Sequence, residues 1–202
     1  MSKRVVLAAV LGSIAMFAWV SVAHMVLPLG ETGVQEIPNN EQAVVTAMQA
    51  QIGNSSGFYI YPGMGLGPHP THEQQRAAME QYDTKLASNP TGILIYHPPG
   101  TKFVMSRHLL IEFFTEFAQV FLVVFLLAQA KPMTFAGRVG FVTIAGVIAA
   151  IATNVSYWNW YGFPTNYTAA YILIQVVGFF CVGIVAALVM KGGAGKQMSA
   201  AA

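Results

Sequence analysis

Four long stretches of the chain are almost entirely apolar, and each is long enough to cross a lipid bilayer as a helix. A spanning helix needs about 20 mostly apolar residues. Hydrophobic residues make up 55% of the chain and charged residues only 9%, against roughly 25% charged residues in soluble domains. The sequence therefore predicts an all-α membrane protein with a four-transmembrane-helix bundle. The predicted spans are residues 5–27, 108–130, 135–155 and 168–190.

The first two spans are separated by a long, much more polar insertion. Within it, residues 41–51 and 71–86 read as helices, and Thr71 and Gln74 have the spacing of a capping box. Each helix is followed by an Asn-x-x-Gly turn and a short β-prone run that ends at proline. The insertion is therefore predicted as a small α/β module built from one helix-turn-strand unit used twice. Units this small bury little apolar surface, so we expect the module to need support from the membrane helices or a partner.

The predicted division of the chain follows from these patterns. It comprises a first transmembrane helix in 1–30, the α/β insertion in 31–106, transmembrane helices 2 to 4 in 107–191, and a flexible cytoplasmic tail in 192–202.

Apart from Arg107, the lysine and arginine residues outside the insertion gather on one side of the predicted bundle, which sets its orientation. Positively charged loops tend to stay in the cytoplasm, so both termini are predicted there and the insertion on the opposite side. The first span also resembles a cleavable secretory signal, but its apolar stretch is longer than a usual signal core, which favours a retained span. The residues on the positive side are Lys3, Arg4, Lys131, Arg138, Lys191 and Lys196.

The only two acidic residues within the predicted spans are Glu112 and Glu116. Ionisable groups in a spanning helix are costly, and they usually face a bundle interior or water. Helical spacing places them in one polar stripe with His108, Thr115 and Gln119. Counted inward from Arg107, both acids fall in the outer half of the bilayer. Polar residues of other spans are expected at the same level, which gives a predicted intramembrane cluster of His24, His108, Glu112, Glu116, Gln119, Asn154 and Gln175.

Three interpretations of this cluster remain open at the level of sequence. The glutamates can pair with neighbouring polar groups and simply fix helix packing. They can instead handle protons or cations. In the third interpretation, His24 and His108, with or without the glutamates, bind a cofactor or metal, since imidazole and carboxylate ligands suit zinc or iron. The sequence does not identify the cofactor, whether haem, pigment or metal ion.

Several other classes of function find no support in the sequence. No hydrolase elbow, His-Glu-x-x-His helix or Cys-His pairing is present, so nothing argues for an enzyme. A net charge of +2 without a basic stripe excludes a nucleic-acid partner. The histidines of the insertion, His69, His72 and His97, are expected in exposed polar roles. The aromatic loop 157–164 is predicted to anchor the third and fourth spans at the lipid surface.

Two phrases, residues 23–30 (AHMVLPLG) and residues 158–164 (WNWYGFP), carry a resemblance to other sequences. Together with the four-span layout, they resemble a loose group of uncharacterised small bacterial four-span membrane proteins. The resemblance implies a multi-pass protein of the bacterial inner membrane and hence a periplasmic insertion, but no activity. The expected function is an accessory or structural subunit of a larger membrane complex, such as a respiratory or photosynthetic one, with other membrane subunits and the lipid bilayer as partners. The proton- or ion-handling and cofactor-binding roles are the alternatives.

Overall fold

The computed structural model describes residues 2–190 and confirms four helices that are long and apolar enough to span a membrane. They are α1 (Lys3–Met25), α4 (Met105–Gln129), the continuous helical run Phe135–Tyr161, and α7 (Thr165–Val189). The run Phe135–Tyr161 consists of α5 (Phe135–Ala150), the π-helical turn η2 (Ile151–Val155) and α6 (Ser156–Tyr161). The described part of the chain is thus mostly helical, at 70%. The predicted tail 192–202 lies outside the described residues.

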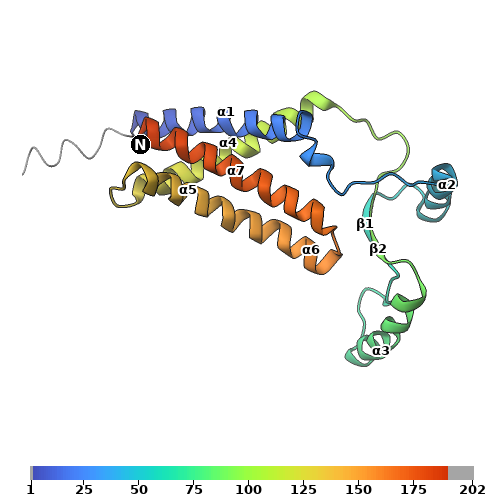
Figure 1. The fold of residues 1–202 in the computed structure, drawn as a ribbon. Helices are drawn as coiled ribbons and strands as arrows, with labels where there is room; N and C mark the ends of the chain where they lie inside the picture. Colours follow the sequence, from blue (N-terminus) through green and yellow to red (C-terminus); the bar gives the residue numbers. More distant parts are fainter. Residues whose placement is uncertain (1, 191–202) are drawn as a thin grey trace, which may run out of the picture. The chain divides into compact units, whose positions relative to one another are not determined.

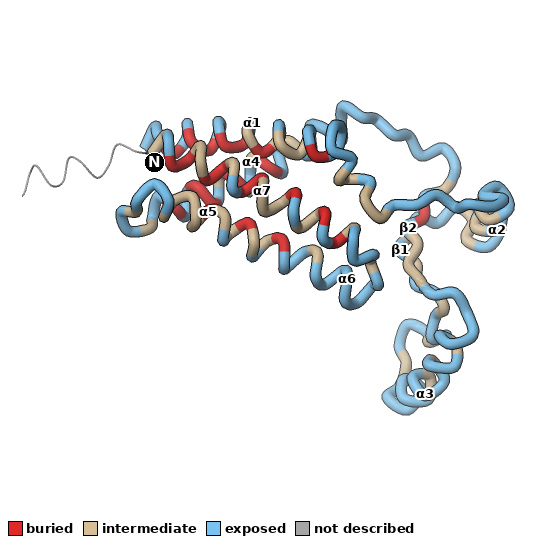
Figure 2. Tube along the Cα trace, viewed as in Figure 1, coloured by how far each residue is buried: buried red, intermediate tan, exposed pale blue. Residues whose placement is uncertain are grey.

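The spanning helices lie alongside one another (Figure 1). Their contacts follow the order α4, α1, α7, α5, so that α1 and α7 form the middle of the bundle. Most of the packing occurs between α1 and α4, α1 and α7, and α5 and α7. Glycines let the neighbouring helices approach each other closely, as is common where membrane helices pack. At Gly12 of α1, an added Cβ would lie 3.0 Å from a methyl group of Val120 and 3.3 Å from one of Val182. Buried residues, most of them aliphatic, therefore lie where α1, α4, α5 and α7 pack together (Figure 2).

The third span ends later than the sequence analysis placed it. Residues 157–161, assigned there to a loop, are helical, and only Gly162, Phe163 and Pro164 separate α6 from α7. Gly162 has a φ of +67°, the left-handed conformation that commonly ends a helix. The aromatic residues themselves have good enough helix propensity to continue the span, so glycine and proline, rather than the change in composition, set the boundary.

The chain folds as two compact units. Unit 1 holds the described residues up to Val34 and from Val104, which include the bundle and the short 3₁₀ turn η1 (Leu29–Glu31). Unit 2 is Gln35–Phe103. Its helices are α2 (Glu41–Ile52) and α3 (His72–Ser88), and its strands β1 (Gly57–Tyr61) and β2 (Gly92–Tyr96) form one antiparallel pair.

Unit 2 confirms the local structure that its sequence predicts. Both expected helices and both expected strands are present. The capping box also forms, since the Thr71 hydroxyl accepts from the backbone N–H of Gln74 and the Gln74 side chain accepts from the backbone N–H of Thr71. The placement of this unit in the periplasm stays a prediction.

Candidate functional site

The most unusual side chain of the bundle is Glu116, near the middle of α4. It lies 11 residues after Met105 and 13 before Gln129, so about 16 Å of helix separate it from the nearer end at a rise of about 1.5 Å per residue. Only 4% of Glu116 is exposed. Neither of its carboxylate oxygens has a hydrogen-bond partner among the described residues. Buried polar groups nearly always have such partners, so this carboxyl group requires an explanation.

Glu112 lies one helical turn before Glu116, toward the end of the bundle where α4 begins. Unlike Glu116 it is exposed, although it belongs to a span. The two carboxyl groups interact electrostatically with each other, and Glu112 also interacts with Tyr171 of α7. The two acids of the predicted polar stripe therefore differ in environment: Glu116 is buried in the packed core and Glu112 is exposed.

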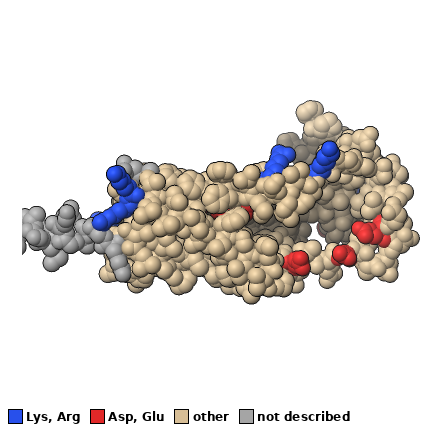
Figure 3. Space-filling view, turned by 90° about the horizontal axis from the view of Figure 1, so that it is seen from above, with Lys and Arg blue, Asp and Glu red and all other residues tan. Residues whose placement is uncertain are grey.

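On α4 itself, the basic side chains Arg107 and His108 lie in the first turn, nine and eight residues before Glu116. Apart from Lys3 and Arg4 at its start and His24 at its end, α1 has no charged or imidazole side chain, and α7 has none at all. On the run Phe135–Tyr161 the only charge is Arg138, in the first turn of α5. The flank of the bundle in Figure 3 is correspondingly free of Lys and Arg over its middle part. A charged Glu116 would thus be compensated neither by an ion pair nor by a hydrogen bond.

His24, a predicted cofactor ligand, is part of an aromatic group near the end of α1. One ring nitrogen, Nδ1, lies 2.9 Å from the carbonyl oxygen of Val20. The ring meets Tyr171 edge-to-face at 6.0 Å and lies so close to Gly30 that a side chain at that position would collide with it. The Tyr171 hydroxyl in turn donates to the Gly30 carbonyl. These contacts hold the segment after α1 against α7.

Asn154 and Gln175 form a separate polar contact. The Asn154 amide donates to the carbonyl of Ala150 at 3.0 Å and to the Gln175 side chain at 3.4 Å, linking η2 to α7. The glutamates, by contrast, lie on α4, which packs mainly on α1. Of the predicted residues, Asn154 and Gln175 thus contact each other between η2 and α7, and the two glutamates lie one turn apart on α4. His24 contacts Tyr171, a residue that the sequence analysis did not select.

The structure assembles no set of metal ligands from the predicted residues. Within residues 2–190, no group of three or more His, Cys, Asp or Glu side chains is arranged to hold one metal ion. His108 is exposed in the first turn of α4, and His24 is engaged as described above. Cofactor binding by His24 and His108 stays a prediction. Glu116 is instead the residue whose buried, unpartnered carboxyl group would be satisfied by a bound ion.

Sequence reasoning missed two features that shape the site. Tyr167 and Tyr171 stack at 4.4 Å on α7, and their separation of four residues is the signal that would have paired them. The indole Nε1 of Trp19 donates to the Ile174 carbonyl at 2.8 Å, which ties α1 to α7. No sequence signal identifies this second contact, since its acceptor is a backbone carbonyl on a distant helix.

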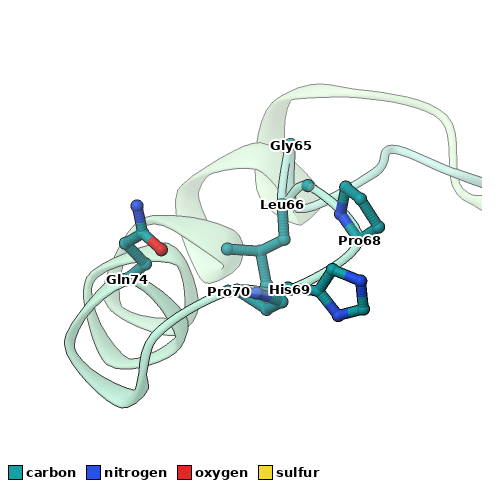
Figure 4. A pocket seen from close by; sticks show the side chains of 7 residues that line it. Gly65, Leu66, Pro68, His69, Pro70 and Gln74 are labelled. Atoms are coloured by element: carbon teal, nitrogen blue, oxygen red, sulfur yellow. The ribbon is translucent and has the colours of Figure 1, made fainter.

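Two hollows elsewhere offer less chemistry than the acidic pair. An apolar groove of about 560 Å³ on the flank of unit 1 is lined only by residues of α5 and α7. In unit 2, a pocket of about 410 Å³ is formed by the loop before α3, around Leu66 and His69 (Figure 4). The one amide side chain in its lining, Gln74, is already engaged in the capping box. Neither hollow brings together charged groups.

Comparisons with protein-family models, curated proteins and solved structures give no match to this chain.

Proposed function

We propose that the bundle handles protons or small monovalent cations at the carboxyl pair Glu112 and Glu116. The observation that carries the proposal is the burial of Glu116 with both oxygens unpartnered. A carboxyl group that served only helix packing would be expected to hydrogen-bond across the helix interface, because that contact is its contribution to stability. Glu116 instead keeps both acceptors free inside the bundle, which is the arrangement needed to accept a proton or a cation.

Glu112 supplies the route by which such an ion reaches Glu116. It is exposed, lies one turn closer to the end of α4, and interacts electrostatically with Glu116. Moving an isolated charge to the middle of a bilayer costs at least about 2.5–3.5 kcal/mol. A proton or monovalent cation shared between the two acids reduces that cost by neutralising one negative charge. The pair can therefore exchange a positive charge between an exposed and a buried carboxyl group.

The direct test is infrared difference spectroscopy of the purified full-length protein in lipid, with changes in pH or in Na⁺ and K⁺ as the only probes. We expect a carboxyl band that responds to one of these probes and that disappears in Glu116→Gln. The matched control is Glu31→Gln, which removes an exposed acid of unit 1 outside the spans and should leave the band intact. Glu112→Gln should shift the band without removing it.

A transport assay then separates ion movement from ion binding. The protein is reconstituted into liposomes with a pH-sensitive dye inside, and a gradient of H⁺, Na⁺ or K⁺ is imposed. We expect a flux above that of protein-free liposomes which is lost in Glu116→Gln and kept in Glu31→Gln. A spectrum without any responsive carboxyl band, together with equal fluxes for wild type and Glu116→Gln, would refute the proposal.

A second proposal, that the chain is a subunit of a larger membrane assembly, is supported by unit 2. Tyr96 is the only buried residue of this unit, with 8% exposed. A two-stranded sheet without a packed face is at best marginally stable in water. Gentle extraction followed by mass determination tests this proposal: we expect a species heavier than one chain, and a strictly monomeric protein with no co-purifying chain would contradict it.

A further inference from the structure

Two contacts between α1 and α4 locate the surroundings of Glu116. The ring of Phe113 on α4 meets that of Phe17 on α1 edge-to-face at 5.6 Å. One turn after Glu116, a methyl group of Val120 lies 3.0 Å from the position of an added Cβ at Gly12 of α1. Positions 113, 116 and 120 share one face of α4. Glu116 therefore lies at the level of the stretch of α1 between Gly12 and Phe17.

This stretch of α1 offers one polar side chain, that of Ser13. Ser13 is fully buried, and its hydroxyl already donates to the carbonyl of Ala9 in the same helix at 2.7 Å. The other buried residue of the stretch is Met16, which packs against α7. On α4 itself, the buried residues that follow Glu116 are all aliphatic, namely Val120, Val123, Val124 and Leu127. The carboxyl group thus lies in a mainly apolar environment.

The backbone supplies no free oxygen at this level of α1, α4 or α7. All three are uninterrupted α-helices here, so their carbonyl groups are used in hydrogen bonds within each helix. Sodium sites between membrane helices commonly use the free carbonyls of an unwound helix. Among the described spans, the π-helical turn η2 departs from regular α-helix, but it belongs to the third span and packs on α7.

We infer that the ion taken up at Glu116 is the proton, and that Na⁺ and K⁺ are excluded from the site. A metal ion that enters a membrane protein exchanges its hydration shell for protein oxygens. On α1 and α4, the buried or half-buried side-chain oxygens at this level belong to Glu116, Ser13 and Gln119, which would replace only part of that shell. A proton needs no shell, because it forms a covalent bond with one carboxyl oxygen. The inference rests on the ion handling proposed above and names its ion.

The titratable groups of the surrounding helices leave protonation as the way to neutralise Glu116. Most of them lie toward the ends of the bundle. The exceptions are Glu112, one turn away, and Cys181, near the same level of α7, and neither supplies a positive charge. A buried carboxylate without a compensating partner is costly, and binding a proton removes that cost. The groups are Arg107, His108 and Glu112 on α4; Lys3, Arg4 and His24 on α1; Tyr167, Tyr171 and Cys181 on α7; and Arg138, Tyr157 and Tyr161 on the third span.

Glu112 is placed to exchange this proton with Glu116. Residues four apart on a helix have Cβ atoms about 5–6 Å apart, so the two carboxyl groups can reach each other directly or through one water molecule. The transfer breaks the O–H bond of Glu112 and forms an O–H bond on Glu116. The negative charge then lies on the exposed Glu112, and the buried side chain is neutral.

The test is an infrared pH titration of the purified full-length protein in lipid. It is carried out in buffers whose cation is Na⁺, K⁺ or N-methylglucamine, which is too large to enter the bundle. We expect a protonated-carboxyl band that weakens as the pH rises, moves to lower frequency in D₂O, and has the same titration midpoint in all three buffers. Glu116→Gln should lack this band, Glu116→Asp should keep a pH-responsive band, and the control Glu31→Gln should leave the band unchanged.

The outcomes separate this inference from the proposed function. If Na⁺ or K⁺ competed with the proton, the midpoint would fall by about one pH unit for each tenfold rise in a saturating ion. A midpoint that moves with either ion, or a Glu116 carboxylate band that responds to either ion at constant pH, would overturn the inference and leave ion handling in place. A protein without any responsive carboxyl band would refute both. The comparison of buffers uses the wild type, so it does not depend on the folding of a variant.

Discussion

Replacing Glu116 by methionine tests whether its carboxyl group stabilises the bundle or serves another purpose. Methionine has a similar length and fills irregular gaps well, so packing is largely kept while both oxygens are removed. The oxygens have no partner in the described structure and the side chain is 4% exposed. Leaving a buried polar group unsatisfied costs about 1–3 kcal/mol. We therefore expect Glu116→Met to raise the free energy of unfolding by about 1–3 kcal/mol.

The sign of this change distinguishes the two interpretations of the residue. If Glu116 held helices together through hydrogen bonds, its removal would lower the free energy of unfolding by about 0.6–1.7 kcal/mol, as measured for such contacts in membranes. Equilibrium unfolding in mixed micelles of mild detergent and SDS, followed by tryptophan fluorescence, gives the free energy directly. All three tryptophans lie in described helices, α1 and α6.

Two controls calibrate the measurement. Gln119→Met removes a half-buried polar group from the same helix, and it should change stability by less than the Glu116 substitution. Val120→Ala removes two methyl groups from a fully buried residue and should destabilise by about 1 kcal/mol or more, which shows that the assay reports packing in this bundle. A clear destabilisation by Glu116→Met, with the controls behaving as expected, would refute the reasoning and restore a structural role.

Two further predictions concern packing and capping. Gly146→Leu should destabilise the bundle by about 1–3 kcal/mol, because a side chain there would collide with Phe179. The control Gly140→Leu should be tolerated, since nothing lies within 4 Å of its added Cβ. Unfolding in mixed micelles measures the stability of both variants, and equal values would contradict the packing argument. Thr71→Ala should destabilise the start of α3 by about 1 kcal/mol. Hydrogen exchange at the backbone N–H of Gln74, which donates to the Thr71 hydroxyl, should become faster. An unchanged exchange rate would show that the cap contributes nothing.

The sequence alone determined the elements of this fold because their signals are local. In a bilayer, a single apolar run satisfies its backbone hydrogen bonds by forming a helix, and four such runs predicted the four spans. Thr71 and Gln74 predicted their capping box from spacing alone, since both bonds lie within one helical turn. The repeated Asn-x-x-Gly phrases likewise predicted two strands. Where the prediction failed, at the end of the third span, the deciding residue was Gly162 rather than the aromatic composition before it.

What only the tertiary structure decided is which helices share an interface and which side chains lie between them. The sequence placed Glu112 and Glu116 in one polar stripe, but only packing against neighbouring helices decides that Glu116 is buried and Glu112 is exposed. It grouped both Asn154 and Gln175 with the glutamates by depth, and the structure shows that these two contact each other between η2 and α7, whereas the glutamates lie on α4. The physical reason is that helical periodicity determines only the face of its own helix on which a residue lies. Which other helix packs against that face depends on small residues such as Gly12 and Gly146, which let particular helices approach closely.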